Sequence, residues 1–233
     1  MLEQLTLNVT LHEGSRFSSF FYDDENKDII TVLKLFSQAF QDEQQQLFLW
    51  GGSQSGKSHL LQACCYQLSE QGMHASYLPL RVLSLYGPSI LKGLDNTNLI
   101  AIDDVDIILG DRDWEEGLFN LINQARTSEQ RLLFSASYNS RDLICKLPDL
   151  ATRLVWGSSY QLLELSSDQK PLLLKFRAQQ RGFDLDDRVI DYIYKRYPRG
   201  TDSLLNIFDK LDEESLRQKA KITIPFVKQV LES

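Results

Sequence analysis

The chain has 233 residues, of which 42% are hydrophobic and 24% charged, a composition typical of a globular protein with one large domain or one domain and a small companion. The net charge is −7, from 25 basic and 32 acidic residues, so sequence-independent DNA binding by this chain alone is not expected; the densest basic group is the small set Lys195, Arg196 and Arg199. No apolar run approaches the roughly 18 to 20 residues of a membrane helix, and the first residues do not resemble a secretory signal.

The three cysteines, Cys64, Cys65 and Cys145, are odd in number and two of them are adjacent. That arrangement fits neither metal-ligand spacing nor a disulfide framework. It predicts reduced core thiols in a cytoplasmic protein. The lack of a long apolar run separately predicts that there is no membrane partner.

Near the start of the chain, the stretch QLTLNV (residues 4–9) alternates leucines with polar residues. Such alternation is typical of an edge strand, and also of a short extended peptide that docks in the groove of another protein. The pattern by itself leaves both interpretations open.

The next part of the chain alternates predicted helices and strands. Apolar spacing predicts helices over 26–40, 57–72 and 114–126, and short apolar runs predict strands over 46–50, 74–80, 99–103 and 131–137. Strands that alternate with helices indicate βαβ units and a parallel sheet. The fold class is therefore α/β, a parallel sheet flanked by helices.

After Gly157 the pattern changes to one short strand candidate, YQLLEL (160–165), followed by helical segments only, over 168–181, 186–197, 202–219 and 225–231. Asp202 is a candidate N-cap of the third segment, and Pro225 suits the first turn of the fourth. The domain organisation that follows is an N-terminal peptide and linker over 1–16, an α/β domain over 17–164 and a small helical domain over 165–233.

The stretch GGSQSGKSHLL matches the phosphate-binding pattern G-x-x-x-x-G-K-[ST], with a predicted strand before it and a helix after it. Backbone N–H groups of such a loop surround phosphates, and the helix directs its positive end at them. Lys57 is expected to reach the β- and γ-phosphates and Ser58 to bind Mg²⁺. The predicted nucleotide-binding residues are Gly51, Gly52, Ser53, Gln54, Ser55, Gly56, Lys57, Ser58 and His59.

The run LIAIDD ends a predicted buried strand with two carboxylates, at the edge of a parallel sheet where ligands bind. Asp103 is expected to hold Mg²⁺ together with Ser58, and Asp104 to orient an attacking water. A capped strand end is the alternative interpretation. With the phosphate loop upstream, the pair predicts ADP or ATP with Mg²⁺ as the cofactor.

Arg153, in PDLATRLVWG, follows the last strand of the predicted core and is far in sequence from the phosphate loop. It is either an ordinary solvated cation or an arginine finger offered to the nucleotide of a neighbouring subunit.

Six motifs follow one another along the chain: GGSQSGKSH, LIAIDD, LLFSAS, LPDLATRLVWG, RGFDLDDRVIDYIYKRY and KITIPFVKQVL. In this order they resemble the AAA+ module of the bacterial replication initiator DnaA, and the similarity extends from about Phe17 to the C-terminus. DnaA has an interaction domain before this module and a DNA-reading domain after it, whereas here about 16 residues precede it and the sequence stops at Ser233. The chain is therefore similar to the Hda-type regulatory homologues of DnaA. Their N-terminal clamp-binding peptide has the form Q-L-x-L-P-L, which QLTLNV resembles.

The resemblance implies roles for single residues. Gln4, Leu5 and Leu7 would dock on the β sliding clamp of DNA polymerase III, while Asn8 and Val9 depart from the family's Pro-Leu pair. Arg153 matches the arginine finger, which would act in trans. The remaining matches are Ser137 at the sensor 1 position, with Asn139 as the alternative, and Phe119 and Asn123 at the interface with DnaA, with apolar packing as the alternative role for Phe119.

Two departures from the family pattern concern hydrolysis by the chain itself. Gln54 replaces a glycine of the loop, and Asp202 stands where DnaA has its sensor 2 arginine, with Arg199 the nearest substitute. A carboxylate repels phosphates, so the resemblance implies weak or no intrinsic ATPase activity and a nucleotide held as a structural switch.

The expected function is that of a regulatory inactivator of DnaA, which links the β sliding clamp to ATP-bound DnaA and stimulates hydrolysis of that ATP, preventing re-initiation of chromosome replication. DNA would be approached only through the clamp, and the AAA+ surfaces are also compatible with a homo-oligomer. The alternative is an autonomous AAA+ ATPase of the DnaA-like or helicase-loader type. A small-molecule P-loop kinase would need an arginine-rich lid, which the helical segment 166–233 does not resemble.

Overall fold

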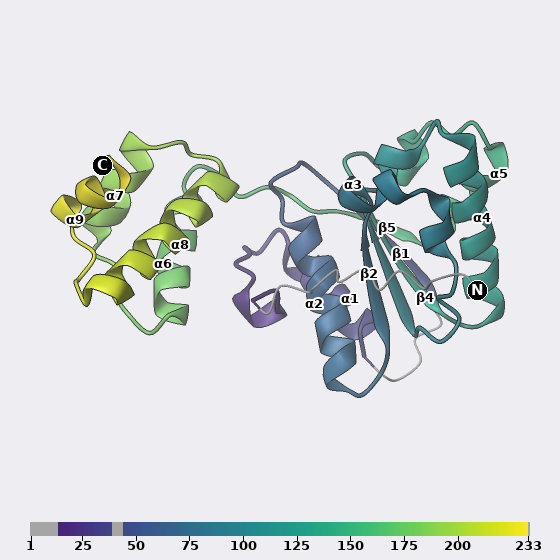
Figure 1. Ribbon diagram of the computed structural model, residues 1–233, viewed down its shortest axis with the longest axis horizontal. Helices are drawn as coiled ribbons and strands as arrows, with labels where there is room; N and C mark the ends of the chain where they lie inside the picture. The colour runs from purple at the N-terminus through teal and green to yellow at the C-terminus, as the bar shows by residue number, and fades with distance from the viewer. Residues whose placement is uncertain (1–13, 39–43, 233) are drawn as a thin grey trace. The chain divides into compact units, whose positions relative to one another are not determined.

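The computed structural model describes residues 14–38 and 44–232, and the chain forms two compact units (Figure 1). One unit contains Asp24–Leu163 and the described residues up to Phe20; the other contains Phe21–Asp23 and the residues from Glu164 on. The predicted clamp-binding residues Gln4, Leu5 and Leu7 lie outside the described residues.

The first unit is built on a parallel sheet of five strands in the order β2-β3-β4-β1-β5. The strands are β1 (Gln46–Trp50), β2 (Ala75–Pro79), β3 (Leu99–Asp103), β4 (Arg131–Ala136) and β5 (Ser158–Gln161). The predicted parallel sheet is confirmed. The strand predicted over 160–165 is wrong in its bounds, because the edge strand β5 is made of mostly exposed polar residues and the buried Leu162 already lies beyond it.

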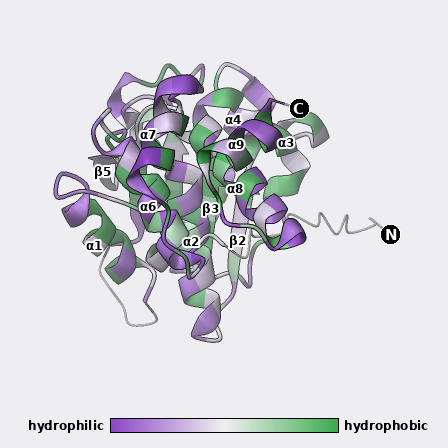
Figure 2. Cartoon of the chain, turned by 90° about the vertical axis from the view of Figure 1, so that its left-hand side faces the viewer, coloured by the Kyte–Doolittle hydropathy of each residue, from purple (hydrophilic) through white to green (hydrophobic). Residues whose placement is uncertain are grey.

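Helices cover both faces of this sheet, with α1 and α2 on one side and α4 and α5 on the other (Figure 1). Their bounds are α1 (Lys27–Phe36), α2 (Lys57–Glu70), α3 (Leu80–Leu83), α4 (Arg112–Thr127) and α5 (Pro148–Leu154), with 3-10 turns η1 (Phe17–Ser19), η2 (Ser84–Tyr86), η3 (Pro88–Leu91), η4 (Val105–Ile108) and η5 (Ser140–Asp142). Helix α1 has hydrophobic and hydrophilic faces, visible as green and purple segments in Figure 2, and it ends at Phe36 rather than near residue 40. The short helices α3 and α5 were not predicted, since one or two turns are too short to show a 3.6-residue period.

The alternation of side chains along β3 determines which face receives its functional residue. Ile100 and Ile102 are fully buried in a core that also contains Phe48, Phe134 and Leu118 of α4. Side chains of a strand alternate between the faces of the sheet, so Leu99, Ala101 and Asp103 lie on the opposite face, which α2 covers. The last residue of this strand therefore presents its carboxylate on the side of the phosphate loop and its helix.

The cysteines do not form disulfides. Cys64 and Cys65 are buried free thiols of α2, and Cys145 is a half-buried free thiol. Burial raises the pKa of Cys65 to about 12 and that of Cys145 to about 11. The prediction of core thiols is confirmed for Cys64 and Cys65.

The second unit is a small bundle of α6 (Lys170–Gln180), α7 (Asp187–Arg196), α8 (Thr201–Gln218) and α9 (Ile224–Leu231), close to the four predicted helices. Leu174, Ile190, Leu204, Phe208 and Val227 are among its buried core residues. The prediction of Asp202 as an N-cap is wrong: Gly200 occupies that position and Asp202 lies, exposed, in the first turn of α8, where a carboxylate still complements the helix dipole.

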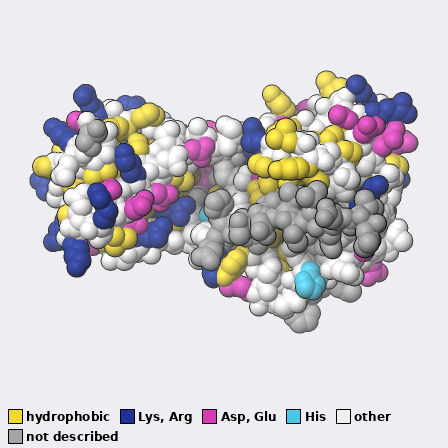
Figure 3. Space-filling model, viewed as in Figure 1, with side chains coloured by type: hydrophobic (Ala, Val, Ile, Leu, Met, Phe, Trp, Pro, Cys, Tyr) yellow, Lys and Arg dark blue, Asp and Glu magenta, His cyan; other side chains and the backbone are white. Residues whose placement is uncertain are grey.

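The charged side chains of the second unit are of both signs and interspersed on the face seen in Figure 3. A continuous basic stripe, as needed for backbone-driven DNA binding, is not present on that face. No helix in residues 14–38 and 44–232 is long and apolar enough to cross a membrane.

Candidate nucleotide-binding site

The order of the strands brings the predicted motifs together at one edge of the sheet. The phosphate loop follows β1, Asp103 ends β3, and β4 lies between these two strands. All five strands are parallel, so their carboxyl ends share this edge, which is where ligands of open α/β sheets bind.

The phosphate loop requires glycine at two positions. Gly56 has a φ of 94°, and a Cβ there would lie 2.5 Å from Cε2 of Phe20. At Gly51 a Cβ would collide with the carbonyl oxygen of Leu162, just beyond β5. The loop is therefore enclosed by chain segments on two sides, and only glycine allows its backbone to pass between them.

Lys57 opens α2 and its side chain is buried across this loop. Its Nζ donates hydrogen bonds to the carbonyl oxygens of Gly51 at 2.8 Å and Gly52 at 2.7 Å. The Ser55 hydroxyl donates to the same Gly52 oxygen at 2.8 Å. In the described chain no side chain caps the start of this 14-residue helix, so its first N–H groups and its dipole are directed at the loop.

A segment before the sheet covers the loop, which the sequence did not predict. The Phe20 ring packs on Gly56 and lies 5.3 Å, centroid to centroid, from the ring of His59. His59 Nε2 is also 2.9 Å from the carbonyl oxygen of Arg16, whose guanidinium stacks 3.9 Å above the Tyr66 ring and pairs with Glu70. His59 thus holds this segment against α2. The contact lies next to the phosphate loop, where His59 was predicted to take part in nucleotide binding.

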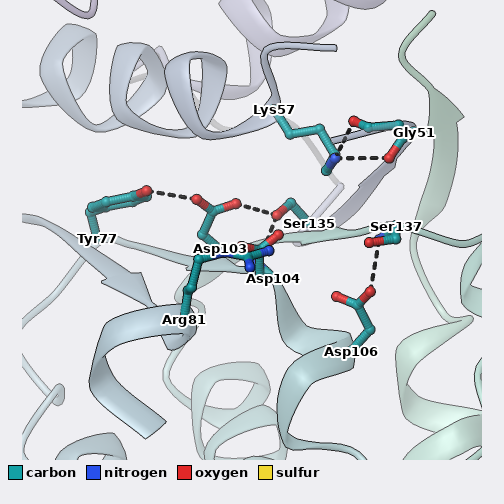
Figure 4. A network of polar contacts seen from close by, with 10 residues as sticks. Gly51, Lys57, Tyr77, Arg81, Asp103, Asp104, Asp106, Ser135 and Ser137 are labelled. Atoms are coloured by element: carbon teal, nitrogen blue, oxygen red, sulfur yellow. Dashed lines mark hydrogen bonds and ion pairs between the residues drawn. The ribbon is translucent and has the colours of Figure 1, made fainter. Parts of the chain in front are cut away.

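The Asp103 carboxylate is buried, and each of its oxygens accepts a hydrogen bond from a hydroxyl group (Figure 4). Tyr77 of β2 donates to Oδ2 at 2.6 Å, and Ser135 of β4 donates to Oδ1. Register explains this: Tyr77 is paired with Ala101, two residues before Asp103, so both side chains are on the α2 face. Burial, followed by the negative charge of Asp103, raises the pKa of Tyr77 well above its usual value, so the phenol remains a donor.

Asp104 adopts the left-handed conformation, with a φ of 56°, immediately after β3. Its N–H donates to the Ser135 hydroxyl at 2.9 Å, and its Oδ2 accepts from Nε of Arg81 at 3.0 Å. Burial and the charge of Asp103 raise the pKa of this carboxyl, against the opposing effect of Arg81. Such backbone conformations outside glycine are concentrated at functional sites.

Ser137, the predicted sensor 1 residue, lies two residues beyond Ser135, just after the end of β4. Ser137 follows β4, and its N–H donates to Oδ2 of Asp106 at 3.1 Å (Figure 4). Asn139, the alternative, caps η5 by accepting from the N–H of Arg141 at 3.1 Å. The hydroxyl that contacts Asp103 belongs to Ser135, which the sequence did not single out.

The oxygen ligands at the carboxyl ends of the strands fit Mg²⁺. A serine hydroxyl at the start of α2, Ser58, and a buried carboxylate, Asp103, are the oxygen ligands that this ion prefers, completed by phosphates and water. Among the described residues, no group of three or more His, Cys, Asp or Glu side chains is arranged to hold a metal ion. Ser58 and Asp103 would hold the ion, which would neutralise phosphate charge.

Arg153 lies elsewhere in the same unit. Its carbonyl oxygen accepts from Nε2 of Gln46 at 3.0 Å, and Gln46 is the first residue of β1, whereas the phosphate loop follows the last. At about 3.3 Å per residue, the two ends of β1 are roughly 13 Å apart. The structure also brings the predicted interface residues to Arg153: Asn123 accepts from its Nε at 3.1 Å, and the Phe119 ring centroid is 5.5 Å from its Cζ.

The fold is that of an AAA+ P-loop module: a parallel sheet with strand order β2-β3-β4-β1-β5, a phosphate loop after β1, two consecutive carboxylates at the end of β3 and a helical C-terminal unit. Residues 167–231 match the family model of the Hda lid domain.

Solved structures of AAA+ proteins have a similar fold. Domain III of DnaA from Thermotoga maritima superposes with a TM-score of 0.77 at 16% identity, over 96% of this chain and 98% of that one. AMPPCP-bound DnaA from Aquifex aeolicus gives a TM-score of 0.73 at 18% identity, over 90% of this chain and 70% of that one. The RuvB Holliday junction branch migration motor of Thermotoga maritima gives 0.62 at 19% identity, over 93% and 73%. The chain therefore has the AAA+ fold of these DnaA structures, and its residues 167–231 are similar to the Hda lid domain, in agreement with the resemblance of its sequence motifs.

Proposed function

We propose that this protein is a nucleotide-bound regulator that links the β sliding clamp of DNA polymerase III to ATP-bound DnaA and stimulates hydrolysis of the DnaA-bound ATP in trans. Loss of ATP from DnaA would prevent re-initiation of chromosome replication. The observation that carries the proposal is the position of Arg153, near the opposite end of β1 from the chain's own phosphate loop.

That position argues for action on another molecule. A separation of roughly 13 Å along β1 exceeds the reach of an arginine side chain, so Arg153 is not placed to contact a nucleotide on its own loop. In the described part of the chain Arg153 forms no ion pair, and its guanidinium interacts with a neutral amide and two aromatic rings. A guanidinium without an acidic partner among the described residues, on a partly exposed surface, suits the stabilisation of phosphate charge in a neighbouring subunit.

The chain's own site supports nucleotide binding. The uncapped start of α2, Lys57 and the residues around it provide donors for the phosphates of ADP or ATP, with Mg²⁺ held by Ser58 and Asp103. Asp104 is the candidate for orienting water, but Arg81 already pairs with its Oδ2. A carboxylate that is already paired is less available to orient water. The pair therefore favours slow intrinsic ATP hydrolysis and a nucleotide that acts as a structural switch.

Replacement of Lys57 by alanine is expected to weaken nucleotide binding by about tenfold to a hundredfold, because hydrogen bonds to a charged donor contribute about 1.5–3 kcal/mol. Isothermal titration with ADP or ATP in Mg²⁺ measures this. Lys92→Ala removes an exposed lysine of the same unit and is the matched control. Affinity within threefold of wild type for Lys57→Ala would contradict this assignment.

The tether to the clamp is proposed from the sequence alone, on Gln4, Leu5 and Leu7, which would occupy pockets as an extended peptide. A chain that lacks residues 1–9 should lose retention by immobilised β clamp and keep its affinity for nucleotide. Equal retention of the truncated and complete chains would show that the clamp is bound elsewhere or not at all.

The proposal as a whole is tested by following hydrolysis of radiolabelled ATP on DnaA, with this protein and DNA-loaded clamp present together or separately. Stimulation that requires both supports the regulatory role. The alternative, an autonomous AAA+ ATPase that pairs with a second copy of itself, is favoured by the presence of both carboxylates, Asp103 and Asp104. It requires substantial phosphate release without DnaA, rising with the concentration of the protein.

A further inference from the structure

We propose that a cavity beside Arg153 is a docking pocket for an acidic side chain of the partner, ATP-bound DnaA, and that Arg126 is the residue that binds its carboxylate. This inference rests on the proposed function, in which Arg153 acts on the nucleotide of DnaA. The cavity has a volume of about 580 Å³ and lies at the amino ends of β1, β4 and β5. The lining residues that carry the proposal are Arg126, Trp156, Gln44, Gln45, Gln46 and Gln130.

Arg126 presents an unpaired guanidinium to this cavity. It lies exposed in the last turn of α4 and forms no ion pair with any described residue. A cation in the last turn of a helix complements the helix dipole, which accounts for a positive charge here but not for its contact with Trp156. The Arg126 Cζ lies 4.0 Å from the centroid of that ring. Cation–π attraction orients the guanidinium plane and leaves its N–H edge open to a carboxylate, which such an edge binds in pairs.

The position of this guanidinium connects the cavity to the proposed site of action. The Cζ of Arg153 lies 3.7 Å from the centroid of the same Trp156 ring. An acidic side chain bound to Arg126 would therefore lie next to the residue proposed to reach the nucleotide of DnaA. Two cations on one ring, without an acidic partner for either among the described residues, also attract an anionic surface.

The rest of the lining suits a polypeptide rather than a second phosphate group. Three consecutive glutamines, residues 44–46, contribute amides, and none of the described lining residues is acidic. Gln130 is buried, and its Nε2 donates to the carbonyl oxygens of Leu94 at 2.6 Å and Thr97 at 2.7 Å. Its Oε1 is buried without a hydrogen-bond partner among the described residues, a costly state that a ligand or a water molecule would relieve. An incoming chain brings N–H donors for amide oxygens as well as its carboxylate, whereas nucleotide phosphates bring acceptors.

The first test measures DnaA ATP hydrolysis, with loaded clamp present, as a function of the concentration of this protein. Arg126→Ala is expected to raise the half-saturating concentration about fivefold to twentyfold, between the effects of an exposed ion pair and a desolvated one, and to leave the maximal rate within twofold. Arg126→Glu should raise it further, because like charges then face each other. Arg112→Ala is the matched control, an exposed arginine in the first turn of the same helix.

The outcomes separate docking from catalysis. A lower maximal rate for Arg126→Ala at an unchanged half-saturating concentration would overturn the proposal, since it would place Arg126 on the nucleotide phosphates. An unchanged titration curve would also overturn it. Arg153→Ala, by contrast, is expected to lower the maximal rate, so the two arginines on one ring should differ in the parameter that they change.

A second test identifies the chemistry of the docked group. Arg126→Lys places an amine at this position, and a carbodiimide joins an amine directly to a carboxylate with loss of water. In the complex with ATP-bound DnaA and clamp, mass spectrometry should find position 126 joined to an Asp or Glu of DnaA, and Arg112→Lys should give no such product. A complex of Arg126→Lys that stimulates hydrolysis without this cross-link would show that no acidic side chain occupies the pocket. Absence of stimulation by the wild-type protein is a failure of the proposed function, and the cross-link to DnaA then still reports on the pocket.

Discussion

Replacement of Arg153 by alanine is expected to reduce stimulation of DnaA ATP hydrolysis by a factor of about 10³ to 10⁵, the range that arginine fingers contribute in related phosphoryl transfers. The physical reason is the loss of a positive charge where negative charge develops on the transferring phosphoryl group. Arg153→Lys keeps a charge but lacks both the Nε–H that Asn123 accepts and the planar fork, so it should recover little of the rate.

The loss should be confined to that activity. The Arg153 backbone is bonded to Gln46 through its carbonyl oxygen, which alanine retains, so the melting temperature should change little. Nucleotide affinity and clamp retention should equal those of wild type, because the phosphate loop is at the other end of β1. Arg141→Ala, an exposed arginine in η5 of the same unit, is the control for a general loss of positive charge. Stimulation by Arg153→Ala within threefold of wild type would exclude the finger role.

The elements predicted well are those whose signal is contained in a few consecutive residues. The bounds of β1 and β3 agree with the prediction because each is a short apolar run closed by glycine or aspartate. The phosphate loop combines glycines, a lysine and flanking periodicity within one segment. Edge strand β5 lacks such a signal: it is mostly exposed, so neither a continuous apolar run nor clean alternation marks it.

The contacts within the site could not be predicted for a different reason. Tyr77, Ser135 and Phe20 reach Asp103 or the phosphate loop only through the register of parallel strands and the path of the chain before the sheet. Their separations in sequence, such as 26 residues between Tyr77 and Asp103, give a single sequence no pattern to detect. The same holds for Asn123 and Arg153, which are 30 residues apart in the sequence and joined by a hydrogen bond in the structure.

Glu115 is a further residue that only the structure reveals. It is fully buried in the first turns of α4, and its carboxylate accepts hydrogen bonds from three backbone N–H groups. Gly110 and Lys146 donate to Oε1 at 2.7 and 3.0 Å, and Leu147 donates to Oε2 at 2.7 Å. One side chain thus joins α4 to the loop before it and to the residues that lead into α5, the helix that carries Arg153.

Glu115→Ala is expected to lower the free energy of unfolding by about 4 kcal/mol, because it leaves three backbone donors without their acceptor and a cavity in their midst. For a chain of this size the melting temperature should fall by roughly 10 °C. Urea denaturation followed by the fluorescence of the neighbouring Trp114, which is buried, measures the change in this unit. The matched control is Glu116→Ala, since Glu116 is half-exposed and forms only a surface pair with Arg112; a loss of less than about 1 kcal/mol is expected.

A loss for Glu115→Ala no larger than that of Glu116→Ala would show that the three N–H groups find other partners and that the carboxylate is not needed. The functional consequence separates Glu115 from Arg153. Because Glu115 anchors the start of α5, its removal should reduce stability and stimulation together, whereas Arg153→Ala removes stimulation from a chain of unchanged stability. Lowering the temperature of the hydrolysis assay should therefore restore part of the rate to Glu115→Ala and none to Arg153→Ala.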